Sequence, residues 1–209
     1  MHFRQRISKG NTDREVTWKN LAKVILFLAF ALGILLANFM GKEKTAGVGI
    51  LNDYFIEKFK YAGINRENLF FYIIGERLPE VLLLLLLAFS SLGIVVGLLN
   101  LGWQGFSIGF MVSAAIAKYG AGGFLIILGS LFPQYIFYMA VYAGCCGLTV
   151  FLRGRFQNIV KTGGINREQM RVLGMGTVAG LFLLLVFVTG IFLESYINPI
   201  FLKKILKFF

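Results

Sequence analysis

Residues 81–99 read VLLLLLLAFSSLGIVVGLL and decide the class of this protein, because this stretch contains no charged side chain. A helix needs ~20 predominantly apolar residues to cross a hydrocarbon layer ~30 Å thick. The Leu82–Leu87 run is apolar on every side, which is typical of a helix surrounded by lipid or by other helices. The stretch therefore predicts one membrane-spanning helix.

The composition of the whole chain agrees with this assignment. Hydrophobic residues make up 57% of the 209 residues, charged residues only 15%, and the mean hydropathy is +0.76. Soluble domains average about 45–50% apolar and about 25% charged residues, so this chain lacks the polar surface that a soluble globule needs. We expect an all-α, polytopic membrane bundle.

Outward from 81–99, apolar segments alternate with polar ones along the chain. A very short connection at 100–102 is expected before a span at 103–117, which would be only about 22 Å long as a helix. Residues 122–152 would form about 46 Å of helix, too long for one crossing, and Pro133 removes a helical hydrogen bond there. We expect a short re-entrant or interfacial segment at 122–132; in an alternative reading, 103–132 forms a re-entrant pair. The five expected spans are 21–40, 81–99, 103–117, 134–152 and 172–193.

The remaining segments are polar or amphipathic. Residues 1–20 form a basic tail, and 21–209 form a single membrane domain. The outer loop 41–80 is expected to carry two helices that lie on the membrane, near 49–59 and 65–74. The end of the chain, 194–209, is expected to be an amphipathic interfacial helix, because its Leu and Phe residues alternate with lysines.

The basic residues orient the chain. Lys and Arg number 21 against 10 acidic residues, a net charge of +11, but the basic residues are distributed between the apolar runs and form no nucleic-acid-binding patch. Segments 1–23 and 153–171 carry six and five basic residues, so both are expected in the cytoplasm. The loop 41–80 and the tail 194–209 are then expected outside.

Small residues recur every fourth position in several spans. Gly105, Gly109 and Ser113 form such a stripe in 103–117, and Gly33 belongs to one in the first span. Close approach of helix backbones requires small residues, so these stripes predict helix packing within the bundle. In an alternative reading, one stripe receives a partner helix, or a second copy of the chain in a homo-oligomer.

Groups that could carry chemistry are few. No charged residue lies within 103–117, 134–152 or 173–193, whereas Glu80 and Glu194 are expected at span ends. The chain has one His, two adjacent cysteines in an apolar run, and no recognisable nucleotide-binding, metalloprotease or hydrolase motif. We expect no catalysis, no cofactor and no metal.

Three segments are more specific than general apolarity: 104–110 (QGFSIGF), 131–140 (LFPQYIFYMA) and 194–199 (ESYINP). Their order, together with the basic tail and the spacing of the spans, resembles the stage II sporulation protein M family over nearly the whole chain. The resemblance implies a non-enzymatic membrane scaffold of endospore-forming bacteria, on the mother-cell side of the sporulation septum and the engulfing membrane.

The same resemblance implies partners. The scaffold would hold two membrane-anchored cell-wall hydrolases, stage II sporulation protein P, which cleaves stem peptides, and stage II sporulation protein D, which cleaves glycan strands. It would act in peptidoglycan remodelling while the membrane engulfs the forespore, and it would carry no catalytic residue itself.

Within these motifs, Pro133, Gln134, Glu194 and Pro199 are predicted structural determinants. Glu194 is expected to accept a hydrogen bond from Gln134, from Arg77 or from a backbone N–H, and so to hold the outer ends of spans together. One rival function is a small transporter or channel subunit, which predicts inverted repeats that meet at broken helices. Pro133 gives one such break. A membrane-embedded enzyme is a further rival.

Overall fold

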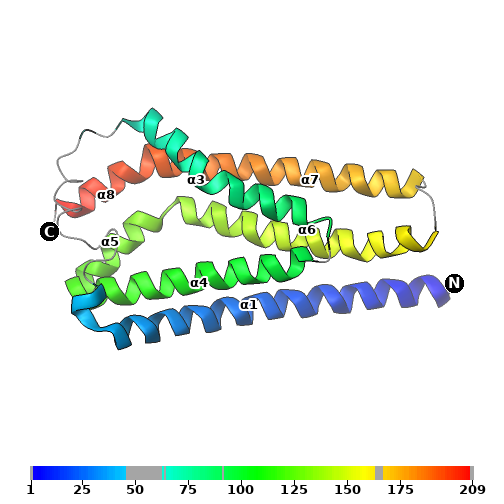
Figure 1. The fold of residues 1–209 in the computed structure, drawn as a ribbon, viewed down its shortest axis with the longest axis horizontal. Coiled ribbons are helices and arrows are strands. Elements are labelled where there is room, and N and C mark those ends of the chain that lie inside the picture. Colours follow the sequence, from blue (N-terminus) through cyan, green and yellow to red (C-terminus); the bar gives the residue numbers. More distant parts are fainter. Residues whose placement is uncertain (1, 46–62, 64, 91, 163–166, 208–209) are drawn as a thin grey trace.

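The computed structural model describes residues 2–45, 63, 65–90, 92–162 and 167–207, and this part of the chain is helical without a strand. Its helices lie along one long axis as an elongated bundle (Figure 1). The elements are α1 (His2–Thr45), α3 (Arg66–Leu87), α4 (Leu92–Tyr119), α5 (Ala121–Leu131), α6 (Gln134–Thr162), α7 (Arg167–Phe192), the π-helical turn η2 (Leu193–Ile197) and α8 (Asn198–Leu206).

Four of these helical stretches are long and apolar enough to cross a membrane: Asn20–Gly41, Leu92–Tyr119, Gln134–Arg153 and Met170–Leu206. The expectation of an all-helical bundle is therefore confirmed over the described residues, and four of its helical stretches have the length and composition that membrane-crossing helices need. The spans expected at 21–40 and 134–152 agree closely with the first and third stretches. The finer count of five crossings stays a prediction.

The connection expected at 100–102 is wrong. Helix α4 runs through it without interruption, so that 103–117 is the second half of one 28-residue helix. The chain turns instead at 88–90, inside the expected span 81–99. The Ser90 hydroxyl accepts a hydrogen bond from the Leu92 amide at 3.2 Å and donates one to the Leu87 carbonyl at 3.1 Å, and so satisfies backbone groups at this helix end.

The boundary expected between the outer loop and the next span is also wrong. Residues 66–87 form one helix, α3, that joins the expected helix 65–74 to the Leu-rich run, with Pro79 inside it. The Asn65 side chain caps its start by accepting from the amides of Glu67 and Asn68 at 3.1 and 3.3 Å. The helix expected near 49–59 lies outside the described residues.

The break at Pro133 is confirmed. Helix α5 ends at Leu131 and α6 begins at Gln134, and the two follow one another along the bundle (Figure 1). Helix α8 packs against α5, where Ile126, Leu202 and Leu206 form a buried cluster. The apolar face of α8 is thus covered by a neighbouring helix, and α8 continues the course of α7 through η2. The expectation that 194–209 lies at the membrane interface stays a prediction.

Helices α1 and α4 are in close backbone contact through glycines. A Cβ atom added at Gly33 would lie 2.2 Å from the Phe106 carbonyl oxygen, and one at Gly109 would lie 2.1 Å from that of Phe30. At Gly105 the corresponding distance to the Leu26 carbonyl oxygen is 2.6 Å. This stripe is therefore used for packing within the chain, and Ser113 lies half-buried further along the same helix.

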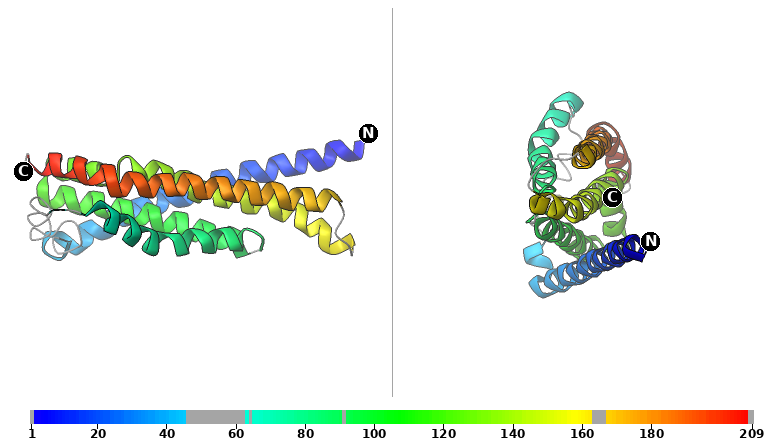
Figure 2. Two further views of the ribbon diagram at one scale, coloured as in Figure 1. Left: turned by 90° about the horizontal axis from the view of Figure 1, so that it is seen from above. Right: turned by 90° about the vertical axis from the view of Figure 1, so that its right-hand side faces the viewer.

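The two ends of the bundle differ. The start of α1, the end of α6 and the start of α7 lie together at one end (Figures 1 and 2). The end of α1, the turn between α4 and α5, and α8 lie at the other end. The described parts of the two basic segments expected in the cytoplasm, 2–23, 153–162 and 167–171, therefore lie toward the same end of the molecule, as the charge rule requires.

Candidate functional site

A polar centre lies inside this otherwise apolar bundle, around an ion pair between α3 and η2. The Arg77 Nη2 atom lies 2.8 Å from the Glu194 Oε1 atom. The Tyr138 hydroxyl donates a hydrogen bond to the other carboxylate oxygen of Glu194, and the Arg77 guanidinium lies 4.7 Å from the centre of the Tyr138 ring. Glu194 is thus held by a cation and a hydroxyl from two different helices.

A second carboxylate, that of Glu80, lies on α3 one helical turn after Arg77. It accepts hydrogen bonds from the Asn100 amide, from the Gln104 amide at 3.5 Å and from the Tyr142 hydroxyl at 3.1 Å. All three donors are neutral. The Tyr135 hydroxyl donates to the Gln104 side-chain oxygen. Helix α6 reaches Glu194 through Tyr138 and Glu80 through Tyr142.

The α6 contribution has a simple helical origin. Tyr135, Tyr138 and Tyr142 are spaced by three and four residues, which places them on one face of the helix. Tyr138 and Tyr142 are 0% and 1% exposed. Because a buried hydroxyl needs a partner, each tyrosine brings a hydrogen bond to the polar centre together with its apolar ring.

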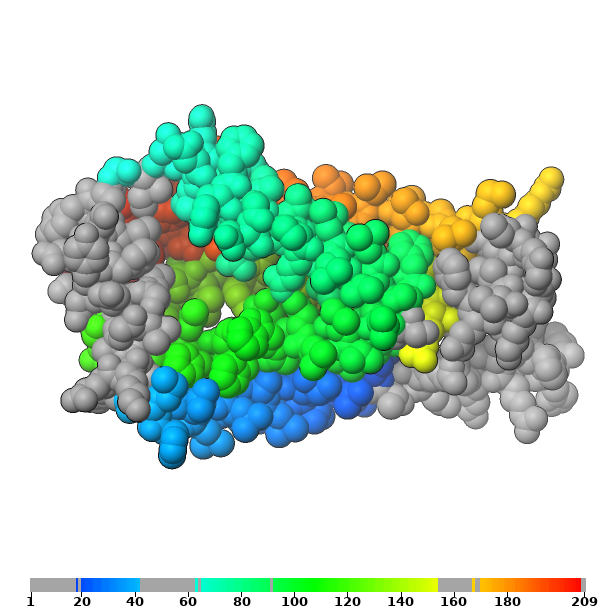
Figure 3. Space-filling model, in the orientation of Figure 1, coloured from blue at the N-terminus to red at the C-terminus, as the bar shows by residue number. Residues whose placement is uncertain are grey.

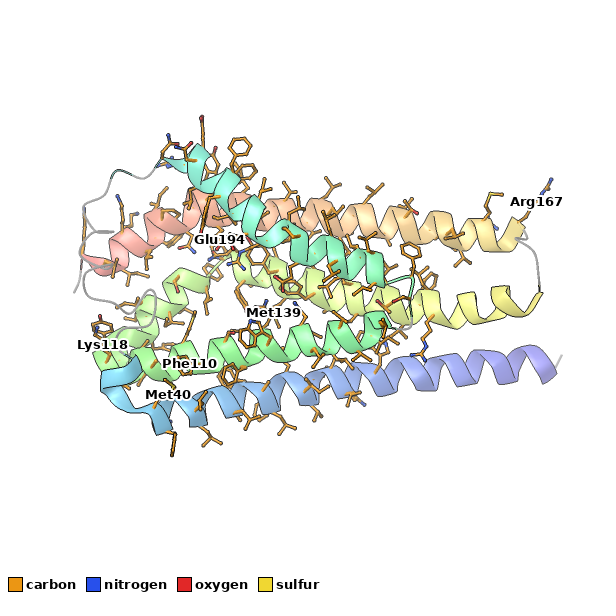
Figure 4. All side chains as sticks on the ribbon, viewed as in Figure 1. Met40, Phe110, Lys118, Met139, Arg167 and Glu194 are labelled. Carbon is orange, nitrogen blue, oxygen red and sulfur yellow. The ribbon has the colours of Figure 1, made fainter. Side chains whose placement is uncertain are left out.

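The polar centre lies well away from both ends of the bundle. Gln104 is 12 residues from the start of α4 and 15 from its end, and the adjacent Gly105 contacts Leu26 inside the apolar stretch Asn20–Gly41. Figure 4 likewise places Glu194 between Arg167 near one end and Lys118 near the other. Glu80 and Glu194, expected at span ends, thus lie inside the helical bundle, because α8 and the first half of α3 extend the bundle beyond them.

Of the three partners expected for Glu194, the structure brings Arg77 to it. Gln134 donates instead to the Ser130 carbonyl, the same oxygen that accepts from the Asn198 side chain. The freed carbonyl at the α5–α6 break is thus satisfied by Gln134 and by the segment that contains Pro199. Gln134, Asn198 and Pro199 are all buried.

The three motif segments therefore meet in space. Segment 104–110 contacts 131–140 through Gln104 and Tyr135, and 131–140 contacts 194–199 through Tyr138 and Glu194. The predicted residues Arg77, Gln134, Glu194 and Pro199 belong to this meeting point. Gly105 and Gly109 lie beside it in the contact between α1 and α4.

Sequence reasoning missed Glu80, Asn100 and the tyrosine face of α6 as parts of the centre. The signal for the tyrosines was their helical spacing, which was visible in the sequence. The signal for Glu80 was weaker: it is one of three charged residues within five positions of a helix that then becomes fully apolar.

The described side chains include no group of three or more His, Cys, Asp or Glu residues that could hold a metal ion. Cys145 and Cys146 are buried and not joined in a disulfide. The polar centre therefore consists of carboxylates, amides, hydroxyls and one arginine, joined by hydrogen bonds and one ion pair.

Comparison of the chain with protein-family models, with curated proteins and with solved structures finds no match. The resemblance to the stage II sporulation protein M family therefore stays an expectation from the motif residues. Their meeting at one polar centre gives these residues a shared structural role, independent of any family.

Proposed function

We propose that this protein is a non-enzymatic membrane scaffold that recruits and localises two peptidoglycan-degrading enzymes, stage II sporulation proteins D and P, during engulfment of the forespore. The observation that carries the proposal is the meeting of 104–110, 131–140 and 194–199. The residues that produce the resemblance are thus the residues that hold four elements of this fold together. A scaffold needs such a fixed body.

The packing of the chain supports a holding role. The glycine contacts between α1 and α4 leave no space between their backbones, and the ion pair joins α3 to η2. An enzyme with a single membrane span diffuses freely, but it gains a high effective concentration near a second enzyme once both bind one rigid multi-helix body. Recruitment of this kind requires no reactive group in the scaffold.

The outer face of α1 offers a surface for neighbours in the membrane. Its side chains Phe27, Leu32 and Phe39 are 71%, 59% and 90% exposed. Lipid tails suit such a surface, and so do the apolar helices of membrane-anchored partners. The proposed place of action is the mother-cell side of the septal and engulfing membranes.

Cross-linking followed by affinity purification from sporulating cells tests the proposal. We expect two cell-wall hydrolases, one specific for stem peptides and one for glycan strands, to co-purify with the tagged full-length chain. Recovery of the tagged protein from septal membranes without either hydrolase would contradict the proposal.

A Glu194→Ala variant tests the role of the polar centre in recruitment. Loss of the carboxylate leaves Arg77 without its partner, so the α7–α8 segment is less firmly held. Hydrolase capture is expected to fall about tenfold or more, because a hydrogen bond to a charged group contributes ≈ 1.5–3 kcal/mol. The comparison is made at equal membrane abundance. Glu67→Ala, an exposed change in the first turn of α3, is the matched control and should capture normally. Equal hydrolase capture by the two variants would show that Glu194 has no role in recruitment.

One observation favours a second candidate function, a small transporter or channel subunit. The polar centre lies beside two helix irregularities, the α5–α6 break and the π-helical turn η2. Substrate sites of secondary transporters lie near such broken helices. Solute flux in proteoliposomes that contain only this chain would favour this function. Proteoliposomes that show no flux would favour the scaffold.

A further inference from the structure

Lysines gather at the end of the bundle where α8 ends. Lys203 and Lys204 lie in the last turn of α8 and Lys207 directly follows it; Lys204 and Lys207 are exposed and Lys203 is half-buried. Lys118, in the last turn of α4, lies at the same end (Figure 4). The adjacent Tyr119 packs against the buried cluster between α5 and α8. These four lysines from two helices form what we call the lysine end.

Apolar side chains lie beside these lysines on the outer surface of α8. Ile200 and Phe201 are exposed, and they precede Lys204 by four and three residues, which places them on the same helix face. On α5, which packs against α8, Phe124 and Leu125 are also exposed. Part of α8 (red) is visible at the surface of the molecule in Figure 3. A helix with this pattern can place its apolar side chains among acyl chains and extend its lysines toward the headgroups.

The ends of the apolar helices indicate that the lysine end lies at the level of a membrane surface. Three of the four candidate spans end here, at Gly41, Tyr119 and Leu206 (Figure 1). Tyrosine is enriched where a membrane meets water, and Tyr119 lies at this level. The lysines therefore lie where hydrocarbon gives way to headgroups.

The charge at this level is unusual for the side on which it is expected. The tail 194–209 is expected outside, where basic residues are normally depleted. Residues 195–209 nevertheless contain three lysines and no acidic residue, and neither α4 nor α5 contains an acidic residue. Basic clusters next to a membrane attract anionic lipid headgroups. The exposed apolar side chains on the same face also require acyl chains beside the anion, which a soluble anion lacks.

We propose that the lysine end binds anionic phospholipid, with the headgroup phosphate at Lys204 and Lys207 and an acyl chain along Ile200 and Phe201. Ammonium groups donate strong hydrogen bonds to phosphate oxygens. A zwitterionic lipid has the same phosphate together with a fixed cation that the lysines repel, so the surface distinguishes the two kinds of lipid. Binding requires no hydrolase, and this inference is therefore independent of the scaffold function.

Fluorescence quenching by nitroxide-labelled lipids tests the proposal on the full-length chain. Both native cysteines are replaced by alanine, a bimane label is attached at Ile200→Cys, and the protein is reconstituted in phosphatidylcholine. Phosphatidylglycerol or phosphatidylcholine with a nitroxide near its headgroup is then added in small proportion. We expect the association constant at this position to favour phosphatidylglycerol about fivefold or more, because each lysine near an anionic surface contributes ≈ 1 kcal/mol.

Two matched triple variants complete the design. The first replaces the three lysines of α8 by glutamine and should remove most of the preference for phosphatidylglycerol. The control removes the same charge from three exposed arginines toward the other end of the bundle and should keep the preference: Arg153→Gln/Arg167→Gln/Arg171→Gln. High salt should reduce the preference, because it screens exposed charges. Equal quenching by the two lipids, or a preference that the lysine variant or high salt leaves unchanged, would overturn the proposal.

Discussion

Replacing Gly109 by Leu is expected to force α1 and α4 apart and to cost about 3 kcal/mol of folding free energy, at the upper end of what overpacked sites show. A Cβ atom at this position would lie 2.1 Å from the Phe30 carbonyl oxygen, and the obstacle is backbone that no rotamer change can move. Thermal unfolding of the purified protein, followed by circular dichroism, should show a midpoint lower by about 5–10 °C.

Gly174→Leu is the matched control for this prediction. Gly174 lies on α7 with nothing within 4 Å of an added Cβ atom, so the same substitution should leave the midpoint nearly unchanged. If the two variants unfold at the same temperature, close backbone contact is not what joins α1 to α4.

Replacing Arg77 by Leu is the second change with a large expected effect. Glu194 would remain as a largely buried carboxylate without a cation, and removal of one partner from a buried ion pair costs about 3–5 kcal/mol. The side chains of Arg77 and Glu194 are 31% and 18% exposed, so we expect a loss of about 3 kcal/mol. Reversible unfolding in mixed micelles measures it.

The double variant Arg77→Leu/Glu194→Leu separates pairing from simple loss of contacts. It should be more stable than the sum of the single changes allows, by about 2 kcal/mol, because no unpaired charge remains. Arg171→Leu, an exposed change on α7, should cost little. Strict additivity of the two single changes would show that Arg77 and Glu194 do not interact.

Part of the fold follows from local rules and could be predicted. The apolar length of 21–40 is sufficient for a helix whatever its neighbours are. Pro133 ends a helix because it lacks the amide hydrogen, and its position gives the boundary between α5 and α6 almost to the residue. The Gly33, Gly105 and Gly109 spacing correctly indicated helix contact, although it could not show that α1 and α4 are the pair.

Other boundaries depend on tertiary contacts. Asn100 and Gly102 look like a turn, yet α4 passes through them because the Asn100 amide is satisfied by Glu80 and Gly102 lies against Ile25. The actual turn was signalled by Ser90, a residue that favours helix starts. The apolar run around it concealed this signal.

The polar centre could not be placed from the sequence alone. Glu80 and Glu194 each border an apolar run, which normally means a position at the membrane surface. In the structure both lie inside the helical bundle, because α8 packs on α5 and lengthens the bundle beyond Glu194, while the first half of α3 does the same beyond Glu80. Only this arrangement of helices shows that Glu80 and Glu194, which are 114 positions apart in the sequence, belong to one polar centre.

We predict that the polar centre lies within the membrane, and the depth of a nitroxide label at Phe192 tests this claim most directly. Phe192 is 49% exposed and lies two residues before Glu194. In reconstituted protein with both cysteines replaced by alanine, collision with oxygen and with a water-soluble nickel complex reports the depth. We predict a label nearly as deep as one at Phe27, on the α1 face beside the Leu26–Gly105 contact. A label at Phe192 as shallow as one at Leu21 would place Glu194 at the membrane surface and contradict the account.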